Sequence, residues 1–250
     1  MTLAGFLVRV VIAAMPSSSQ VPHSLKLELA DGQRWLIRPV DDRAAAVVAE
    51  LGTVMCLSPG EVGRELCVAV CKESDRFDVE RGGAVVCRLA VPTDRATQVA
   101  QMRRIASQIA REALFRGGLL FHGALAEYRG SAFIMAGPGD VGKSTASRRL
   151  PSPWRSLCDD MTLVVRDCKG RFWAHPWPTW SRFNNGGPGG SWAVEQAVPL
   201  RAQVDIIEGE EPGVFGEFGG KIIVRQVHPG GNRAGLVVIM CIGPSHLAGR

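Results

Sequence analysis

The segment Gly137–Ser144 reads Gly-Pro-Gly-Asp-Val-Gly-Lys-Ser and matches the phosphate-loop pattern G-x-x-x-x-G-K-S. Glycines let the backbone turn tightly with positive φ angles, so that successive N–H groups point into one concavity. In such a loop Lys143 would reach the β- and γ-phosphates of a nucleotide, and the Ser144 hydroxyl is suited to Mg²⁺. The pattern predicts these phosphate-binding residues: Gly137, Gly139, Asp140, Val141, Gly142, Lys143, Ser144 and Thr145.

The segments on either side of this loop fit the same interpretation. Residues 131–136 form a short apolar run, which is typical of a buried strand. Residues 145–150 can open a helix, which Pro151 should end early. A Gly-rich turn without a ligand is the alternative, but it does not require a strand before it and a helix after it. We therefore interpret the segment as a nucleotide site.

Composition sets the class of protein. The chain has 250 residues, 46% of them hydrophobic and 21% charged, which is ordinary for a globular protein of one large or two small domains. Its net charge of +5 suits an anionic ligand. We find no run of Lys or Arg in the sequence and therefore expect neither nucleic acid nor a membrane as a partner.

The cysteines indicate a reducing compartment. There are seven, an odd number, and none of them forms a C-x-x-C pair. Most lie in apolar runs, so we expect reduced, buried thiols in a cytoplasmic protein rather than a disulfide framework or a zinc site.

The N-terminal part is expected to contain a tail and a small module. Residues 1–20 are interpreted as a loose tail, because their apolar stretch contains Arg9 and is too short to span a bilayer. Residues 21–92 are predicted to form a small α+β module that could bind a peptide or partner. It should contain a hairpin around Asp31-Gly32, a helix over 44–51 capped by Asp41-Asp42, and strands over 66–70 and 84–89.

Residues 93–207 are predicted to form the unit that carries the loop. Its first element is a helix that starts at Pro92-Thr93-Asp94 and ends at Gly117-Gly118. Its apolar face consists of Val99, Met102, Ile105, Ile109, Ala113 and Leu114. Residues 208–250 are a Gly-rich segment of uncertain order, in which only 221–227 and 234–242 are typical of strands.

Three acidic or basic side chains complete the candidate site. A phosphate loop needs a carboxylate for Mg²⁺ and, for phosphate transfer, a group that orients or deprotonates the acceptor. Asp159 and Asp160 follow a short strand downstream of Lys143, and we favour a functional role for them over a helix cap or surface turn. His122 ends an apolar run just before Gly123 and, taken alone, would be a structural histidine.

The order His122-Gly123, loop, Asp159-Asp160 resembles the catalytic domain of the HPr kinase/phosphorylase family. The resemblance covers roughly residues 118–180, and it is closest to short stand-alone members in peptide natural-product cassettes, including the SynChlorMet cassette family and lasso-peptide kinases. The Leu-Phe-His-Gly-Ala sequence at 120–124, His175-Pro176 and Pro178-Thr179-Trp180-Ser181 also fit this subgroup. The fold implied is α/β (α+β), with an HPr-kinase/PEP-carboxykinase-like P-loop core beside the small N-terminal module.

The resemblance implies an ATP- and Mg²⁺-dependent serine (or threonine) kinase that acts on a small protein or precursor peptide, with a possible homo-oligomer. By resemblance, Lys143 would hold the transferring phosphate, Ser144 and Asp159 would bind the metal, Asp160 would be the general base, and His122 would tune that base. The downstream Glu-x-Arg-Gly-type signature and the large N-terminal domain of the HPr enzymes are not recognisable here, which argues against HPr as the substrate and against a reverse reaction.

Two other functions remain open. A nucleotide-binding regulatory or assembly protein without kinase chemistry would use the same loop. A GTPase or ordinary ATPase switch is favoured least, since the chain contains no Asn-Lys-x-Asp sequence. For Trp177 and Trp180 the sequence leaves a substrate surface and a core position equally open.

Overall fold

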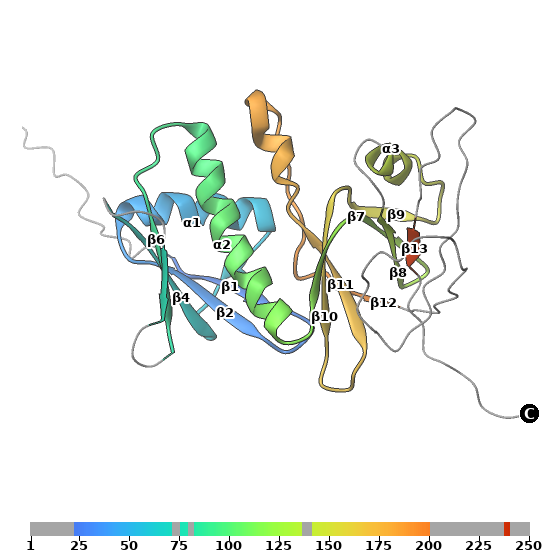
Figure 1. The fold of residues 1–250 in the computed structure, drawn as a ribbon, viewed down its shortest axis with the longest axis horizontal. Helices are drawn as coiled ribbons and strands as arrows, with labels where there is room; N and C mark the ends of the chain where they lie inside the picture. The colour runs from blue at the N-terminus through green and yellow to red at the C-terminus, as the bar shows by residue number, and fades with distance from the viewer. Residues whose placement is uncertain (1–22, 72–75, 80–82, 137–141, 201–237, 241–250) are drawn as a thin grey trace, which may run out of the picture.

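The computed structural model describes residues 23–71, 76–79, 83–136, 142–200 and 238–240. Within these ranges the protein is a mixed α+β structure dominated by strands. Figure 1 shows two sheets, one built from the N-terminal residues and one from the residues after 118, with helix α2 between them.

Six of the described strands form the first sheet, in the order β3-β1-β2-β4-β6-β5. Their bounds are Leu25–Glu28 (β1), Arg34–Pro39 (β2), Ser58–Pro59 (β3), Arg64–Val70 (β4), Arg76–Val79 (β5) and Val85–Leu89 (β6). β1 and β2 pair antiparallel, whereas β2, β4 and β6 run parallel. The predicted hairpin and both predicted strands of this module are thereby confirmed.

Helix α1, Asp42–Met55, connects the parallel strands β2 and β4. The Asp41 carboxylate accepts a hydrogen bond from the Ala44 N–H at 2.9 Å, which satisfies one of the unpaired donors of the first turn. The predicted apolar side chains at 47, 48 and 51 are buried against the sheet. The cap and the buried face of this helix are both as the sequence predicts.

Helix α2, Arg95–Phe115, is the longest described element. Asp94 and Thr97 form a capping box at its start, in which each side chain bonds to the backbone of the other residue. The helix ends before Gly117, whose φ is +81°, and Gly118, where a Cβ would lie 2.7 Å from the Val164 carbonyl oxygen. The predicted apolar face is buried except at its C-terminal end, where Leu114 is 40% exposed.

The second sheet has the order β13-β8-β12-β11-β10-β7-β9. Its bounds are Leu119–Tyr128 (β7), Ser131–Ala136 (β8), Arg155–Cys158 (β9), Met161–Arg166 (β10), Phe172–Trp177 (β11), Val198–Leu200 (β12) and Val238–Met240 (β13). β7 also pairs with β8. The five strands β7, β8, β12, β11 and β10 therefore form a closed ring in which each strand pairs with the next and β10 pairs with β7. β13 lies within the predicted 234–242 strand, and the predicted 221–227 strand lies outside the described residues.

Two short helices flank this sheet. Helix α3, Lys143–Arg148, ends before Pro151 as predicted. Residues Trp180–Gly186 form a 3-10 helix, η1, which packs against α2.

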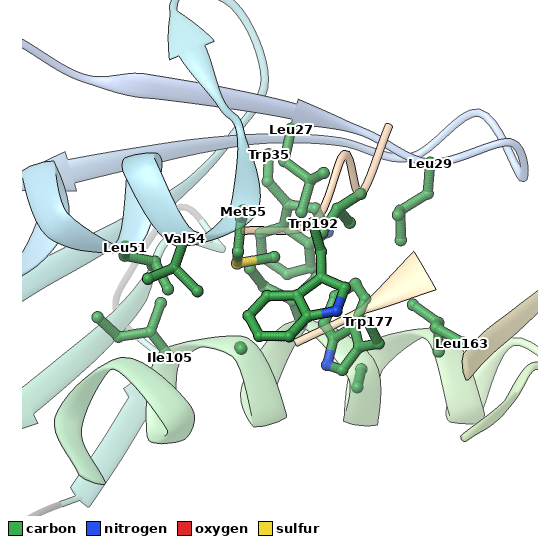
Figure 2. Packing of buried hydrophobic residues seen from close by; sticks show 14 of the residues in the cluster. Leu27, Leu29, Trp35, Leu51, Val54, Met55, Ile105, Leu163, Trp177 and Trp192 are labelled. Carbon is green, nitrogen blue, oxygen red and sulfur yellow. The ribbon is translucent and has the colours of Figure 1, made fainter. Parts of the chain in front are cut away.

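One hydrophobic cluster joins the two sheets. It contains Leu27 and Trp35 from the N-terminal sheet, Leu51 from α1, Ile105 from α2 and Trp177 from β11. Figure 2 shows these side chains with Trp192, which lies at the junction. Trp177 is 2% exposed, so it belongs to the core rather than to a substrate surface. Trp180 is partly buried against the same cluster.

The described cysteines are buried, half-buried or exposed, and Cys71 is the half-buried one. Cys67, Cys87 and Cys158 are buried, as predicted. Cys56 and Cys168 are exposed, because they lie at a helix end and in a hairpin turn rather than inside strands. Each of the described cysteines carries a reduced thiol. No helix in the described ranges is long and apolar enough to cross a membrane.

Candidate functional site

The end of the predicted phosphate loop lies between β8 and α3. Gly142 precedes the helix with a φ of +95°, a conformation that favours glycine. Lys143 is the first residue of α3 and is buried at 7% exposure, Ser144 is half-buried, and Thr145 is exposed. The remaining predicted loop residues lie outside the described ranges: Gly137, Gly139, Asp140 and Val141.

Two hydroxyl contacts hold α3 against the strand that follows it. The Ser144 hydroxyl donates to the Asp159 carbonyl oxygen at 3.1 Å. The Ser147 and Ser156 hydroxyls are hydrogen-bonded at 2.7 Å. The loop end and the Asp159-Asp160 pair are therefore adjacent in space, as the order of these motifs in the sequence predicts.

The chain bends at Asp159-Asp160 between β9 and β10, so the two carboxylates are directed to different partners. Asp159 is 6% exposed. Its Oδ2 accepts from Arg148 at 2.8 Å and lies 3.2 Å from an Arg182 nitrogen, and its Oδ1 accepts from the Thr179 hydroxyl at 3.0 Å.

These contacts determine the charge of Asp159. Burial alone would raise its pKa, but the hydrogen bonds from Arg148 and Thr179, together with the positive charges of Arg182 and Arg148, outweigh burial and lower the pKa. Asp159 is therefore ionised at neutral pH, as a metal ligand or an ion-pair partner must be.

Asp160 instead contacts His122, with 2.6 Å between Asp160 Oδ1 and His122 Nε2. The side chain of His122 is 59% exposed and that of Asp160 is 26% exposed, so the pair faces solvent. The pairing of β7 with β10 explains their proximity, because His122 lies opposite Met161, the residue after Asp160. The predicted His-Asp pair is thus present.

Gly123 keeps the backbone at His122 close to β8. A Cβ at Gly123 would lie 3.0 Å from both the Met135 carbonyl oxygen and an Ile134 methyl group. The Gly123 carbonyl also accepts from the buried Thr162 hydroxyl at 2.9 Å. Glycine allows this close approach, which holds His122 beside the end of β8 and thus beside the loop.

The donors in this site are of the kind that Mg²⁺ prefers. Ser144 and Asp159 supply a hydroxyl and a carboxylate oxygen, and nucleotide phosphates would supply further oxygens. The described part of the chain contains no group of three or more His, Cys, Asp or Glu residues arranged for a metal.

Sequence reasoning did not find Arg148, Thr179 and Arg182. Arg148 is in the predicted loop helix and Thr179 is in a quoted motif, but no local pattern relates either residue to Asp159. Arg182 belongs to η1 and reaches Asp159 only through the fold. Only the tertiary structure brings these three side chains to one carboxylate.

His175 takes part in a different contact, at the junction of the two sheets. It is fully buried, and its Nδ1 lies 2.7 Å from the Val194 carbonyl oxygen. Its Nε2 accepts from the Ala30 N–H at 3.2 Å. Both contacts are satisfied by the neutral ring with the proton on Nδ1. The His175-Pro176 element therefore joins the sheets together.

Comparison with protein families identifies the family. The family model described as "SynChlorMet cassette protein ScmC" matches residues 85–216, more than half of the chain. The chain therefore belongs to the SynChlorMet cassette protein ScmC family. The matched range includes His122, the predicted loop and Asp159-Asp160. A comparison with curated proteins found no match.

Proposed function

We propose that this protein is an ATP- and Mg²⁺-dependent serine (or threonine) kinase with an HPr-kinase/PEP-carboxykinase-like P-loop core. Its substrate would be a small protein or precursor peptide in the cytoplasm. The observation that carries the proposal is the solvent-facing His122–Asp160 pair, which adjoins Asp159 and thus the Gly142–Ser144 end of the loop. Membership of a cassette family agrees with a peptide as the acceptor.

The proposed chemistry uses Asp160 as the base. The contact with His122 engages Oδ1 and orients the carboxylate, which leaves Oδ2 to accept the proton of the acceptor hydroxyl. The acceptor oxygen then bonds to the γ-phosphorus, the bond from phosphorus to the β–γ bridging oxygen breaks, and ADP leaves. His122 is a positioning residue in this scheme, because it acts through Asp160.

The loop end would hold the nucleotide. Lys143 would pair with its phosphates, and Ser144 and Asp159 would be the protein ligands of Mg²⁺. When bound, Mg²⁺ supplies positive charge to the phosphate oxygens. Positioning and charge neutralisation are the main requirements of phosphoryl transfer, and this set of side chains can meet both.

A nucleotide-binding regulatory or assembly protein is the second candidate. The observation that favours it is the Asp159 carboxylate, which two arginines and Thr179 already contact. A protein that binds a nucleotide without transferring phosphate would need no metal at that carboxylate. Nucleotide binding without transfer to any peptide would support this function.

The deciding experiment incubates the protein with γ-labelled ATP, Mg²⁺ and each peptide or small protein that is encoded beside the gene. We compare the parent protein with Asp160→Asn and with a control variant, Asp42→Asn, which lies on an exposed part of α1. Label on a peptide serine or threonine with the protein and the control, but not with Asp160→Asn, supports the kinase. Equal labelling by both variants would exclude Asp160 as the base.

A further inference from the structure

Asp159 is held between two arginines that come from different elements. Arg148 is on α3 and Arg182 is on η1, and each contacts the same carboxylate oxygen. The Asp159 side chain is 9% exposed, whereas the side chains of Arg148 and Arg182 are 59% and 37% exposed. The carboxylate is thus buried behind two guanidinium groups that remain accessible from solvent beside the loop end.

Each arginine retains donors for a second anion. A guanidinium carries five N–H donors in a planar fork. In the contacts described, Arg148 and Arg182 each meet Asp159 through a single terminal nitrogen and share one oxygen, rather than forming a two-point contact with both carboxylate oxygens. The other donors can therefore bind phosphate oxygens, for which the arginine fork is well suited.

The charges around the loop end also fit a polyphosphate. Lys143, Arg148 and Arg182 are positive, whereas Asp159, which contacts both arginines, and Asp160, which contacts His122, are negative. A nucleotide triphosphate brings several negative charges, so its binding would place anions beside arginines that one buried carboxylate only partly neutralises.

The backbone of Arg182 is held in place by the turn that follows η1. The Gly189 N–H donates to the Arg182 carbonyl at 3.1 Å. A Cβ on Gly187 would lie 2.2 Å from the same carbonyl oxygen, so only glycine allows this turn to pack so closely. The ring of Phe183, the next residue, lies 6.2 Å from the ring of Trp192 between centroids, at a tilt of 47°. Arg182 therefore projects from an anchored segment.

We propose that Arg148 and Arg182 are phosphate-binding residues, which Asp159 orients until the nucleotide arrives. This inference rests on the proposed nucleotide site and adds two ligands for the phosphates. The two arginines contact the nucleotide, whereas Asp159 positions them. In a nucleotide complex they would hold the phosphate oxygens, which would leave the Asp159 carboxylate available to hold Mg²⁺.

Binding of ATP in EDTA to the full-length protein tests this inference without involving the metal. Arg182→Ala and Arg148→Ala should each weaken ATP binding about 10- to 100-fold, as expected for the loss of charged hydrogen bonds. The matched control is Arg171→Ala. Arg171 contacts Asp167 at 2.7 Å with side-chain exposures of 60% and 8%, much like Arg148 and Asp159, but lies in the β10–β11 hairpin. Arg171→Ala should bind ATP as the parent protein does.

Repeating the arginine changes in an Asp159→Asn background separates phosphate binding from simple neutralisation of Asp159. If Arg182 only neutralised the carboxylate, its removal would no longer matter once Asp159 is uncharged. We expect the loss of affinity to persist, and its disappearance would overturn the inference. Arg182→Gln can keep a hydrogen bond to Asp159 without the charge, and is the second variant if Arg182→Ala does not fold.

The outcomes also separate this inference from the proposed function. If the parent protein does not bind ATP, the proposed function fails and this inference fails with it. If the parent protein binds ATP and both arginine variants bind it as tightly as Arg171→Ala does, only this inference fails.

Discussion

His122 and Asp160 are neighbours because His122 lies opposite Met161 in the β7–β10 ladder, which brings His122 Nε2 to 2.6 Å from Asp160 Oδ1. Both side chains reach solvent beside the loop end, so they can be changed with little effect on packing. In enzymes, loss of a general base costs about 10²- to 10⁴-fold in rate.

From the proposed roles of Asp160 as general base and His122 as its positioning residue, we predict that Asp160→Asn lowers phosphate transfer by about 10²-fold or more and that His122→Ala has a smaller effect. Single-turnover transfer measures both changes, and thermal melting checks that the variants remain folded. A larger loss for His122→Ala than for Asp160→Asn would reverse the assigned roles.

Stability at acid pH should depend on His175. Burial lowers its pKa below the ordinary 6.5, although the hydrogen bond to Val194 and the charge of Asp31 act in the opposite direction. Because the unfolded chain binds the proton at higher pH than the folded protein does, stability should fall as pH drops below about 6.5. The fall levels off once pH is below the folded pKa.

The expected slope in that window is up to about 1.4 kcal/mol per pH unit for one proton. Denaturant unfolding between pH 7 and pH 5 measures it, with His175→Gln as the variant that cannot titrate. An unchanged slope in His175→Gln would assign the effect to another group.

The cap of α1 should contribute to stability through two bonds. Asp41 accepts from the Ala44 N–H at 2.9 Å and from the Val70 N–H at 3.2 Å, so it links the helix start to β4. We predict that Asp41→Ala costs about 1–2 kcal/mol of unfolding free energy, since both donors lose their partner. The control is Asp42→Ala at the neighbouring position, which should change the free energy of unfolding by less than about 0.5 kcal/mol. Similar losses in the two variants would argue against the cap.

Trp177 should behave as a core residue. It is 2% exposed within the cluster of Figure 2, so Trp177→Ala should lower the unfolding free energy by about 3–5 kcal/mol. Phe115→Ala, at a position that is 79% exposed, is the control and should be nearly neutral. If Trp177→Ala lost ATP or peptide binding without losing stability, Trp177 would belong to a ligand surface and not to the core.

The N-terminal module should be required for folding of the remainder. The buried face of α2 belongs to the same cluster as Leu51 and Trp35, and the Trp192 N–H donates to the Val54 carbonyl at 2.8 Å. A chain that starts at Thr93 would expose this face, and we expect it to lose cooperative thermal unfolding. Cooperative unfolding of the shortened chain would show that the two parts fold independently.

Much of the fold could be predicted from short stretches of sequence. Alternation at Leu25 and Leu27, the caps at Asp41 and Asp94, and the runs on both sides of the loop each correspond to an element in the structure. These signals are local, since caps and side-chain periodicity depend on residues a few positions apart. The exposed Cys56 and Cys168 and the helix η1 were missed, because their surroundings depend on packing.

For the candidate site too, one part could be predicted from the sequence and the other part depends on the tertiary structure. The sequence by itself supplied the candidate residues of the proposed site: Lys143 through the phosphate-loop pattern, and Asp160 and His122 through the resemblance to a kinase family. Only the tertiary structure decided that Arg148 and Arg182 both contact Asp159 and that His175 joins the two sheets. It also decided that one hydrophobic cluster contains residues of both sheets. Such contacts depend on strand register and on side chains far apart in the chain, whose positions are fixed only when the two sheets pack around α2.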